Sequence, residues 1–209
     1  MFDVDAHRAE KYKTQFVTIL KKHFPEVDAA VLADTLSLAA ERGKISYDEI
    51  EIREDLKEDL LLQLEKERIL IPYNTSKTIG WEDRVLVFKP GEIYEMPHVI
   101  RNLVKILRDY GEWDPEQAIN VCLGEIGEPE PEKITGLFEK MMEDAESNYV
   151  TPDNLMRKAG ELEQKSCLII AELKGGGIIS PCLRNPARLR YEVNPSLIKG
   201  SIFESVTAS

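Results

Sequence analysis

Apolar residues recur every three or four positions through much of the chain, and this pattern predicts a mainly helical protein. Two start signals support the helix boundaries: Ser46 and Glu49 form a capping box, and Asp114 precedes a proline at the first helical position. Gly43 is a typical helix end. The predicted helices cover residues 5–24, 28–42, 46–68, 97–109, 131–144 and a segment that begins at 114.

Short runs rich in β-branched and aromatic residues interrupt the helices and predict two β-hairpins. In the first half of the chain these runs are residues 69–71 and 84–88, joined by a polar loop. In the second half they are residues 178–182 and 190–195, and Asn185-Pro186 between them is a turn signal. We therefore expect small hairpins attached to a helical body.

The end of the chain repeats the order of elements found in the first half. Ile45-Ser46 before an acidic first turn corresponds to Val150-Thr151 before a second acidic first turn. Residues 69–73 and 178–182 each follow a helix and begin a hairpin. Both copies are predicted to contain a helix, a short strand, two further helices and a hairpin.

This order of elements resembles a winged-helix domain, over residues 27–91 and again over residues 131–199. The resemblance implies an α+β fold that is mainly α with small β-hairpins, in which tandem winged-helix-like units are joined by a helical, acidic middle segment. The predicted organisation is an N-terminal helix (1–26), the first unit (27–91), the connector (92–130), the second unit (131–199) and a tail (200–209).

Charge is distributed unevenly along the 209 residues, whose formal net charge is −11. Residues 109–145 hold 2 basic and 11 acidic residues, whereas residues 146–209 hold 8 basic and 7 acidic residues. An acidic protein repels a phosphate backbone at long range. Because the acidic excess lies in the middle of the chain, this repulsion need not apply to the second unit.

The winged-helix resemblance implies a test for nucleic-acid binding, since the third helix of such domains enters the major groove and the wing contacts the backbone. In the first unit that helix, residues 53–68, carries six acidic and four basic residues and is a poor phosphate-facing surface. The second unit is a better candidate, because arginines cluster on its hairpin and polar residues begin its last helix. Its candidate DNA-contacting residues are Arg184, Arg188, Arg190, Lys165, Gln164, Ser166 and Lys174.

Two further features suggest contacts with other proteins. Trp81 lies in the polar loop of the first hairpin, where it either packs back on the body or forms an exposed anchor for a partner. The helix over residues 1–26 has no role inside a winged-helix unit, and such helices commonly mediate dimerisation. We therefore expect a partner contact at Trp81 and a homodimer.

The sequence gives little support for metal binding, cofactor binding or catalysis. Cys122, Cys167 and Cys182 form no CxxC pair, and the three histidines have no metal-ligand spacing, so neither a metal nor another cofactor is expected. No catalytic constellation is recognisable, which argues against an enzyme. The absence of a long apolar run and of a secretory signal indicates a cytoplasmic protein with no membrane contact.

These observations predict a DNA-associated, transcription-regulator-like protein that contacts duplex DNA mainly through the wing of the second unit. The alternative is an acidic tandem winged-helix adaptor that mediates protein–protein interactions, similar to the kleisin-associated subunit of bacterial condensin. The first hypothesis requires the basic residues of the second unit to gather on one face. The second requires an exposed apolar patch, around Trp81 or along residues 167–173.

Overall fold

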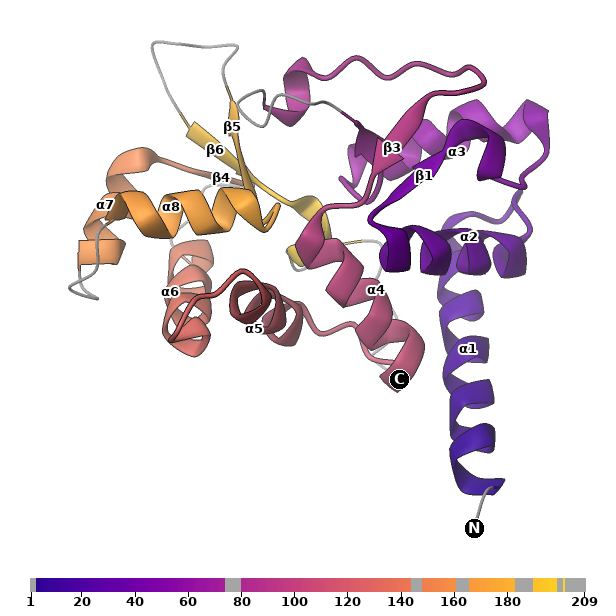
Figure 1. The fold of residues 1–209 in the computed structure, drawn as a ribbon, viewed down its shortest axis with the longest axis horizontal. Helices are drawn as coiled ribbons and strands as arrows, with labels where there is room; N and C mark the ends of the chain where they lie inside the picture. The colour runs from indigo at the N-terminus through magenta and orange to yellow at the C-terminus, as the bar shows by residue number, and fades with distance from the viewer. Residues whose placement is uncertain are drawn as a thin grey trace.

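The computed structural model describes residues 3–73, 80–143, 148–160, 166–182, 190–198 and 201. These residues are mainly helical and form two small antiparallel sheets, which confirms the predicted α+β class. Figure 1 shows the two sheets in the upper part of the molecule, above most of the helices, with α1 extending downward to the N-terminus.

The first two helices follow the sequence signals closely. Helix α1 spans Asp3–His23, and α2 spans Ala29–Arg42. Asp28 caps α2, since its carboxylate accepts the backbone N–H of Ala30 at 2.9 Å. Gly43 ends the helix in the left-handed region, at a φ of 76°, which glycine adopts without a steric penalty.

The next part of the first unit differs from the prediction. The capping box between Ser46 and Glu49 is present, but it begins only the 3₁₀ turn η1 (Tyr47–Glu49), and helix α3 spans Glu54–Lys66. The helical stretch predicted over 46–68 is thus divided, and α3 agrees with the separate helix predicted over 53–68. Residues 50–53 alternate between buried and exposed positions, which is the pattern of an extended chain rather than of a helix.

The two sheets have the same topology. In the first, β1 (Lys44–Ser46) and β2 (Ile71–Pro72) flank β3 (Ile93–Glu95). The second places β4 (Tyr149–Val150) and β5 (Ile179–Cys182) on either side of β6 (Arg190–Val193). In each sheet the last strand along the chain is central and pairs antiparallel with both others.

The strand predicted at residues 84–88 is wrong. This segment follows the 3₁₀ turn η2 (Trp81–Asp83) and forms no strand, and the Val85 side chain is 77% exposed. The third strand of the sheet is instead β3, which extends the first unit beyond its predicted end at residue 91. Residues 84–88 lie against β3 through side-chain bonds, because the Tyr94 hydroxyl donates to the Val87 carbonyl at 2.5 Å.

The middle of the chain is the centre of the fold rather than a peripheral connector. Helix α4 (His98–Tyr110) packs against α1, α2 and α5 (Pro115–Glu125). Asp114 caps α5 as predicted, by accepting the N–H of Gln117 at 2.9 Å. Seven residues of α4 are buried: Val99, Ile100, Asn102, Leu103, Val104, Ile106 and Leu107.

The second half of the chain has an order of elements similar to that of the first half. Helix α6 (Pro131–Glu143) precedes β4, and α7 (Pro152–Gly160) and α8 (Ser166–Gly175) precede β5 and β6. The 3₁₀ turn η4 (Pro195–Leu197) follows the hairpin. Residues from both units belong to one buried apolar cluster, so the two halves share a core.

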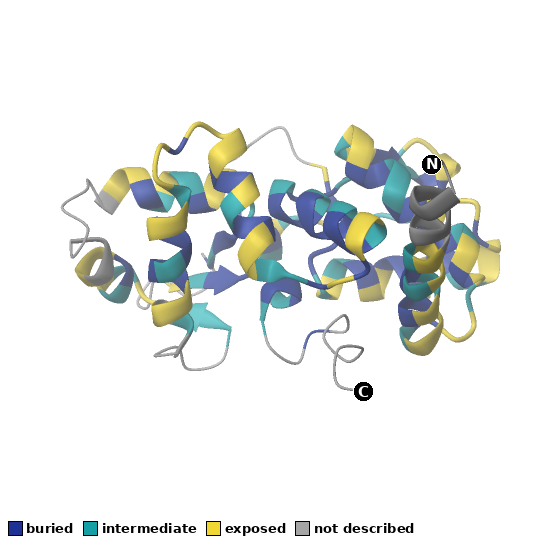
Figure 2. Cartoon of the chain, turned by 90° about the horizontal axis from the view of Figure 1, so that it is seen from below, coloured by how far each residue is buried: buried dark blue, intermediate teal, exposed yellow. Residues whose placement is uncertain are grey.

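Helix α1 also contributes to this core. Phe16, Ile19, Leu20 and Phe24 are buried, and the helix packs against α2 and α4. Figure 2 shows exposed positions recurring along the outer helices, while buried positions gather in the middle of the molecule. The helix thus has a role within the chain, and dimerisation through it stays a prediction. No helix in the described part of the chain is long and apolar enough to cross a membrane.

Candidate functional site

A buried ion pair joins the two units. Arg68 follows α3, and its guanidinium reaches the Glu192 carboxylate on β6 at 3.3 Å and also pairs with Glu65. The side chains of Arg68 and Glu192 are only 10% and 11% exposed. Arg68 adopts a φ of 53° because it ends α3 in a left-handed turn, in which the Ile69 N–H donates to the Leu64 carbonyl.

Neutral hydrogen bonds extend this junction. Asn194, fully buried, donates from its side-chain amide to the Arg68 carbonyl at 3.3 Å. The Ser196 hydroxyl donates to the Glu67 carbonyl at 2.8 Å, and the Trp113 indole donates to the Ser196 carbonyl at 3.1 Å. The sequence analysis identified none of these contacts, because each joins residues more than 80 positions apart and leaves no local signature.

Trp81 is part of the same junction and is not an exposed anchor. Its side chain is 5% exposed, and its backbone N–H donates to the Ser180 hydroxyl at 3.0 Å. The Arg68 guanidinium lies 5.9 Å from the centroid of its ring. The prediction that Trp81 contacts a partner is therefore wrong, since the residue packs against the second unit of its own chain.

The candidate DNA-contacting residues are only partly described. Arg190 is exposed, and its guanidinium lies 3.8 Å from the centroid of the Tyr149 ring. Lys174 is exposed at the end of α8, and Ser166 begins that helix. Arg184, Arg188, Gln164 and Lys165 lie outside the described residues. The predicted basic face is thus represented by Arg190 and Lys174 alone.

The exposed face of α8 is apolar over residues 167–171 and carries Lys174 near its C-terminal end. Ile169 and Leu173 are fully buried, whereas Cys167, Leu168 and Ala171 face solvent on the opposite side. Leu168 is 53% exposed, and Met156 on the adjacent helix α7 is 45% exposed. This is the apolar patch that the sequence analysis required of an adaptor along residues 167–173.

The corresponding helix of the first unit has a different surface. The exposed residues of α3 are mainly acidic, and Lys57, a base of this helix, is buried against the Tyr47 ring at 4.4 Å. Such a surface repels a phosphate backbone. The exposed residues of α3 are Glu54, Asp55, Glu58, Asp59, Leu62, Gln63 and Lys66.

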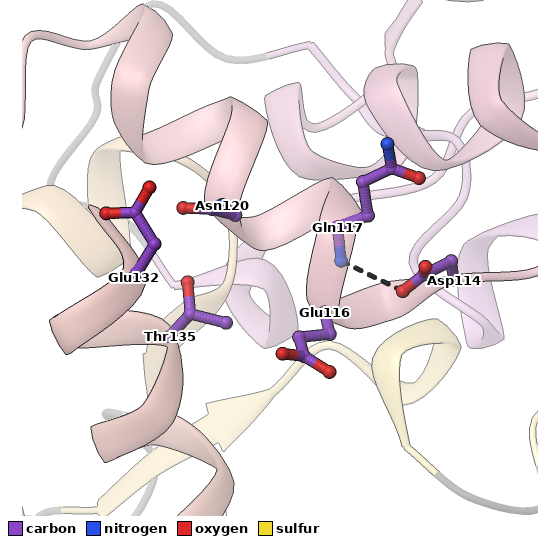
Figure 3. A pocket seen from close by; sticks show the side chains of 6 residues that line it. All are labelled: Asp114, Glu116, Gln117, Asn120, Glu132 and Thr135. Carbon is purple, nitrogen blue, oxygen red and sulfur yellow. Dashed lines mark hydrogen bonds between the residues drawn. The ribbon is translucent and has the colours of Figure 1, made fainter.

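A polar hollow of about 310 Å³ lies between α5 and α6. Figure 3 shows its lining, including the bond between Gln117 and the capping carboxylate of Asp114. The acidic residues belong to the caps and first turns of the two helices, where negative charge stabilises the helix dipole. This stabilisation explains the acidic character of the hollow without a ligand. The lining residues are Asp114, Glu116, Gln117, Asn120, Glu132 and Thr135.

Two carboxyl groups meet between α8 and the segment that joins α5 to α6. Glu128 is 5% exposed, and one of its oxygens accepts the Glu130 N–H at 3.0 Å. Burial, followed by the hydrogen bond and charge of Glu128, raises the pKa of Glu172 to about 7. One oxygen of Glu172 is buried without a hydrogen-bond partner among the described residues. Glu172 therefore titrates near neutral pH.

A comparison with known proteins adds a family assignment. No curated protein matches the chain, and no solved structure matches it. One protein-family model matches residues 13–202, from α1 to beyond η4, and so includes both sheets and the junction between them. Because this match covers almost the whole chain, the protein belongs to that family, whose function is uncharacterised.

Proposed function

We propose that this chain is a protein-interaction adaptor built from two diverged winged-helix units, and that a protein partner binds the exposed face of α8. The shared strand order of the two sheets supports the winged-helix assignment, since in each the last strand is central. In both units a helix, a short strand and a further helix precede the hairpin, with the 3₁₀ turn η1 in the first unit where the second has α7. A binding role rather than an enzymatic one agrees with the lack of a catalytic constellation in the sequence.

The apolar surface of α8 is the observation that carries this proposal. In a winged helix that reads DNA, the corresponding helix presents polar and basic side chains to base edges and phosphates. Here Leu168, Cys167 and Ala171 occupy the exposed face, and Met156 lies on the neighbouring helix. Burying these side chains against an apolar patch of a partner removes hydrocarbon from water, which is favourable by about 25 cal/mol per Å².

The test compares two leucines that are similarly exposed on corresponding helices. Tagged wild type, Leu168→Asp and Leu62→Asp are used to capture proteins from cells that make this chain, and the captured proteins are quantified by mass spectrometry. Leu62 is 48% exposed on α3 and serves as the matched control. We expect Leu168→Asp to lose a partner that wild type and Leu62→Asp retain. Equal recovery by all three proteins would contradict binding at α8.

A DNA-associated regulator is the second candidate. Its support is the exposed Arg190 at the base of the second hairpin, with Lys174 exposed at the end of α8. The measurement is fluorescence anisotropy of labelled duplex DNA in a salt series, with wild type and an Arg184→Ala/Arg188→Ala/Arg190→Ala variant. Salt-sensitive binding that the variant loses would favour this candidate. No binding at about 50 mM salt, where the electrostatic attraction is strong, would exclude it for generic DNA.

We also propose that the protein acts in the cytoplasm. Support comes from Cys122, Cys167 and Cys182, which are all free thiols, as is usual for proteins in a reducing compartment. Fractionation of cells that make the protein tests this placement directly. Recovery of the chain with the cytosolic fraction is the expected result, and recovery outside it contradicts the proposal.

A further inference from the structure

Three metal-ligating side chains from both units converge at the junction. Glu82 belongs to η2 of the first unit, Cys182 ends β5, and Glu192 lies in β6. Their carboxylate oxygens and thiol sulfur all lie within 4.8 Å of one another. Cys182 is 4% exposed and Glu192 is 8% exposed, so two of the three groups are removed from water. Clusters of exposed acidic groups are common, but burial of this kind is expensive unless the charges are compensated.

Close backbone packing holds these groups together. A Cβ atom added at Gly80 would lie 2.1 Å from the Pro181 carbonyl oxygen, so the chain before Glu82 rests directly on the strand that carries Cys182. The hydrogen bond from the Trp81 backbone N–H to the Ser180 hydroxyl holds the same two segments together. Ser180 in turn faces Glu192 in the strand register. The three side chains are therefore positioned by the fold, without a need for large rearrangement.

Two arginines lie beside the cluster, Arg68 at Glu192 and Arg190 at Cys182. Burial, and then the charges of Glu82 and Glu192, raise the pKa of the Cys182 thiol to about 11. Arg68 contacts the Glu192 carboxylate at 3.3 and 3.4 Å. A divalent cation between the three groups would bind Cys182 as a thiolate, because coordination deprotonates a thiol outright.

We propose that Glu82, Cys182 and Glu192 bind a zinc ion that joins the two units. A thiolate with two carboxylates suits Zn²⁺, whereas Mg²⁺ and Ca²⁺ take oxygen ligands and Cu(I) prefers sulfur. Three protein ligands leave a fourth position for water or for a group from another molecule. Arg68 would then be an outer-shell partner that orients the Glu192 carboxylate, as is usual for ligating carboxylates.

Cobalt reports this site directly, because Co²⁺ occupies zinc sites and gives a charge-transfer band when a thiolate binds it. Metal-free protein is titrated with CoCl₂ in the presence of a non-thiol reductant, and ZnCl₂ is then added. We expect a thiolate–cobalt band that saturates at one equivalent and disappears when zinc displaces the cobalt. The Cys182→Ser variant should lose the band, whereas Cys167→Ser, which removes an exposed thiol, should retain it.

The Glu82→Gln variant tests the carboxylate contribution without altering a fully buried residue. Loss of a ligand should weaken zinc binding by at least the roughly 10–100-fold cost of losing an outer-shell partner. Competition with a chromophoric chelator measures this change, and circular dichroism checks that each variant is folded. The proposal is overturned if no band forms at one equivalent, if Cys182→Ser keeps it, or if Glu82→Gln binds zinc as tightly as wild type. These outcomes are independent of whether a partner binds α8.

Discussion

Gly80 lies so close to Pro181 that a side chain at this position would collide with the neighbouring strand: an added Cβ would be 2.1 Å from the Pro181 carbonyl oxygen. The contact joins residues 101 positions apart, one from each unit. Together with the Arg68–Glu192 pair, it makes the two units one packed body. Association of the units is therefore expected to depend on a few residues whose replacement has a large effect.

Gly80→Ala should be destabilising because the added methyl group meets backbone rather than a flexible side chain. We expect a loss of about 1–3 kcal/mol in the free energy of unfolding, the usual range for overpacking. Gly124→Ala is the matched control, since nothing lies within 4 Å of a Cβ at this position of α5. It should raise stability by up to about 1 kcal/mol through helix propensity. Urea unfolding of both variants measures the difference, and equal effects would contradict the packing described for Gly80.

Replacement of Arg68 should lower the free energy of unfolding more than Gly80→Ala does. Arg68→Met leaves the buried Glu192 carboxylate without its partner, and breaking a buried pair typically costs about 3–5 kcal/mol. Because Glu192 can take up a proton instead, the loss should be larger at pH 8 than at pH 5. The control is Arg157→Met, whose exposed guanidinium bonds only locally to Asn154 and should change stability by less than about 0.5 kcal/mol. Comparable losses in the two variants would argue against a structural ion pair at the junction.

Glu172 should make stability depend on pH near neutrality. Its pKa is raised from 4.5 to about 7 in the folded chain, so the folded state holds the proton more tightly than the unfolded state. The associated stabilisation is complete below about pH 4.5 and is lost as the pH rises through about 7. Glu172→Gln should therefore reduce the decline in urea midpoint between pH 5 and pH 8.

The control for this pH dependence is Glu58→Gln. Glu58 is an exposed carboxylate on α3, away from the Glu128–Glu172 pair. Glu58→Gln should keep the wild-type dependence of the urea midpoint on pH. A Glu172→Gln profile that is indistinguishable from wild type would contradict the raised pKa of Glu172.

Local sequence signals predicted helix ends correctly where a capping residue is present. Gly43 and Asp114 act as the caps that the sequence indicated, because capping depends on residues within four positions. The Ser46–Glu49 box also forms, but only one turn of 3₁₀ helix follows it. A cap specifies where a helix begins and not how long it is, since burial of Ile50 and Ile52 extends the chain there.

Strand composition misled the prediction at residues 84–88. β-branched residues favour a strand only when a neighbouring strand pairs with them. The strand that does pair, β3, alternates exposed Ile93 and partly buried Glu95 with buried Tyr94 and Met96. The hydropathy of these residues does not alternate, because the exposed position 93 is an isoleucine, and so β3 had no clear signal in the sequence.

The candidate site was predictable only in part. The apolar character of residues 167–173 was visible in the sequence, but which of them face solvent depends on how α8 packs. The burial of Trp81 was not predictable, because a polar loop does not reveal that a distant strand covers its tryptophan. Long-range contacts such as Arg68–Glu192 leave no local pattern.

The central claim, that a protein binds the exposed face of α8, is tested most directly by photo-crosslinking in cells. A photoreactive amino acid is placed at position 168 in one variant and at position 62 in a control, and adducts are identified by mass spectrometry. The account predicts one discrete protein adduct from position 168 that is lost when Met156→Asp is added, and none of that mass from position 62. Absence of a protein adduct at position 168, or the same adduct from both positions, would contradict it.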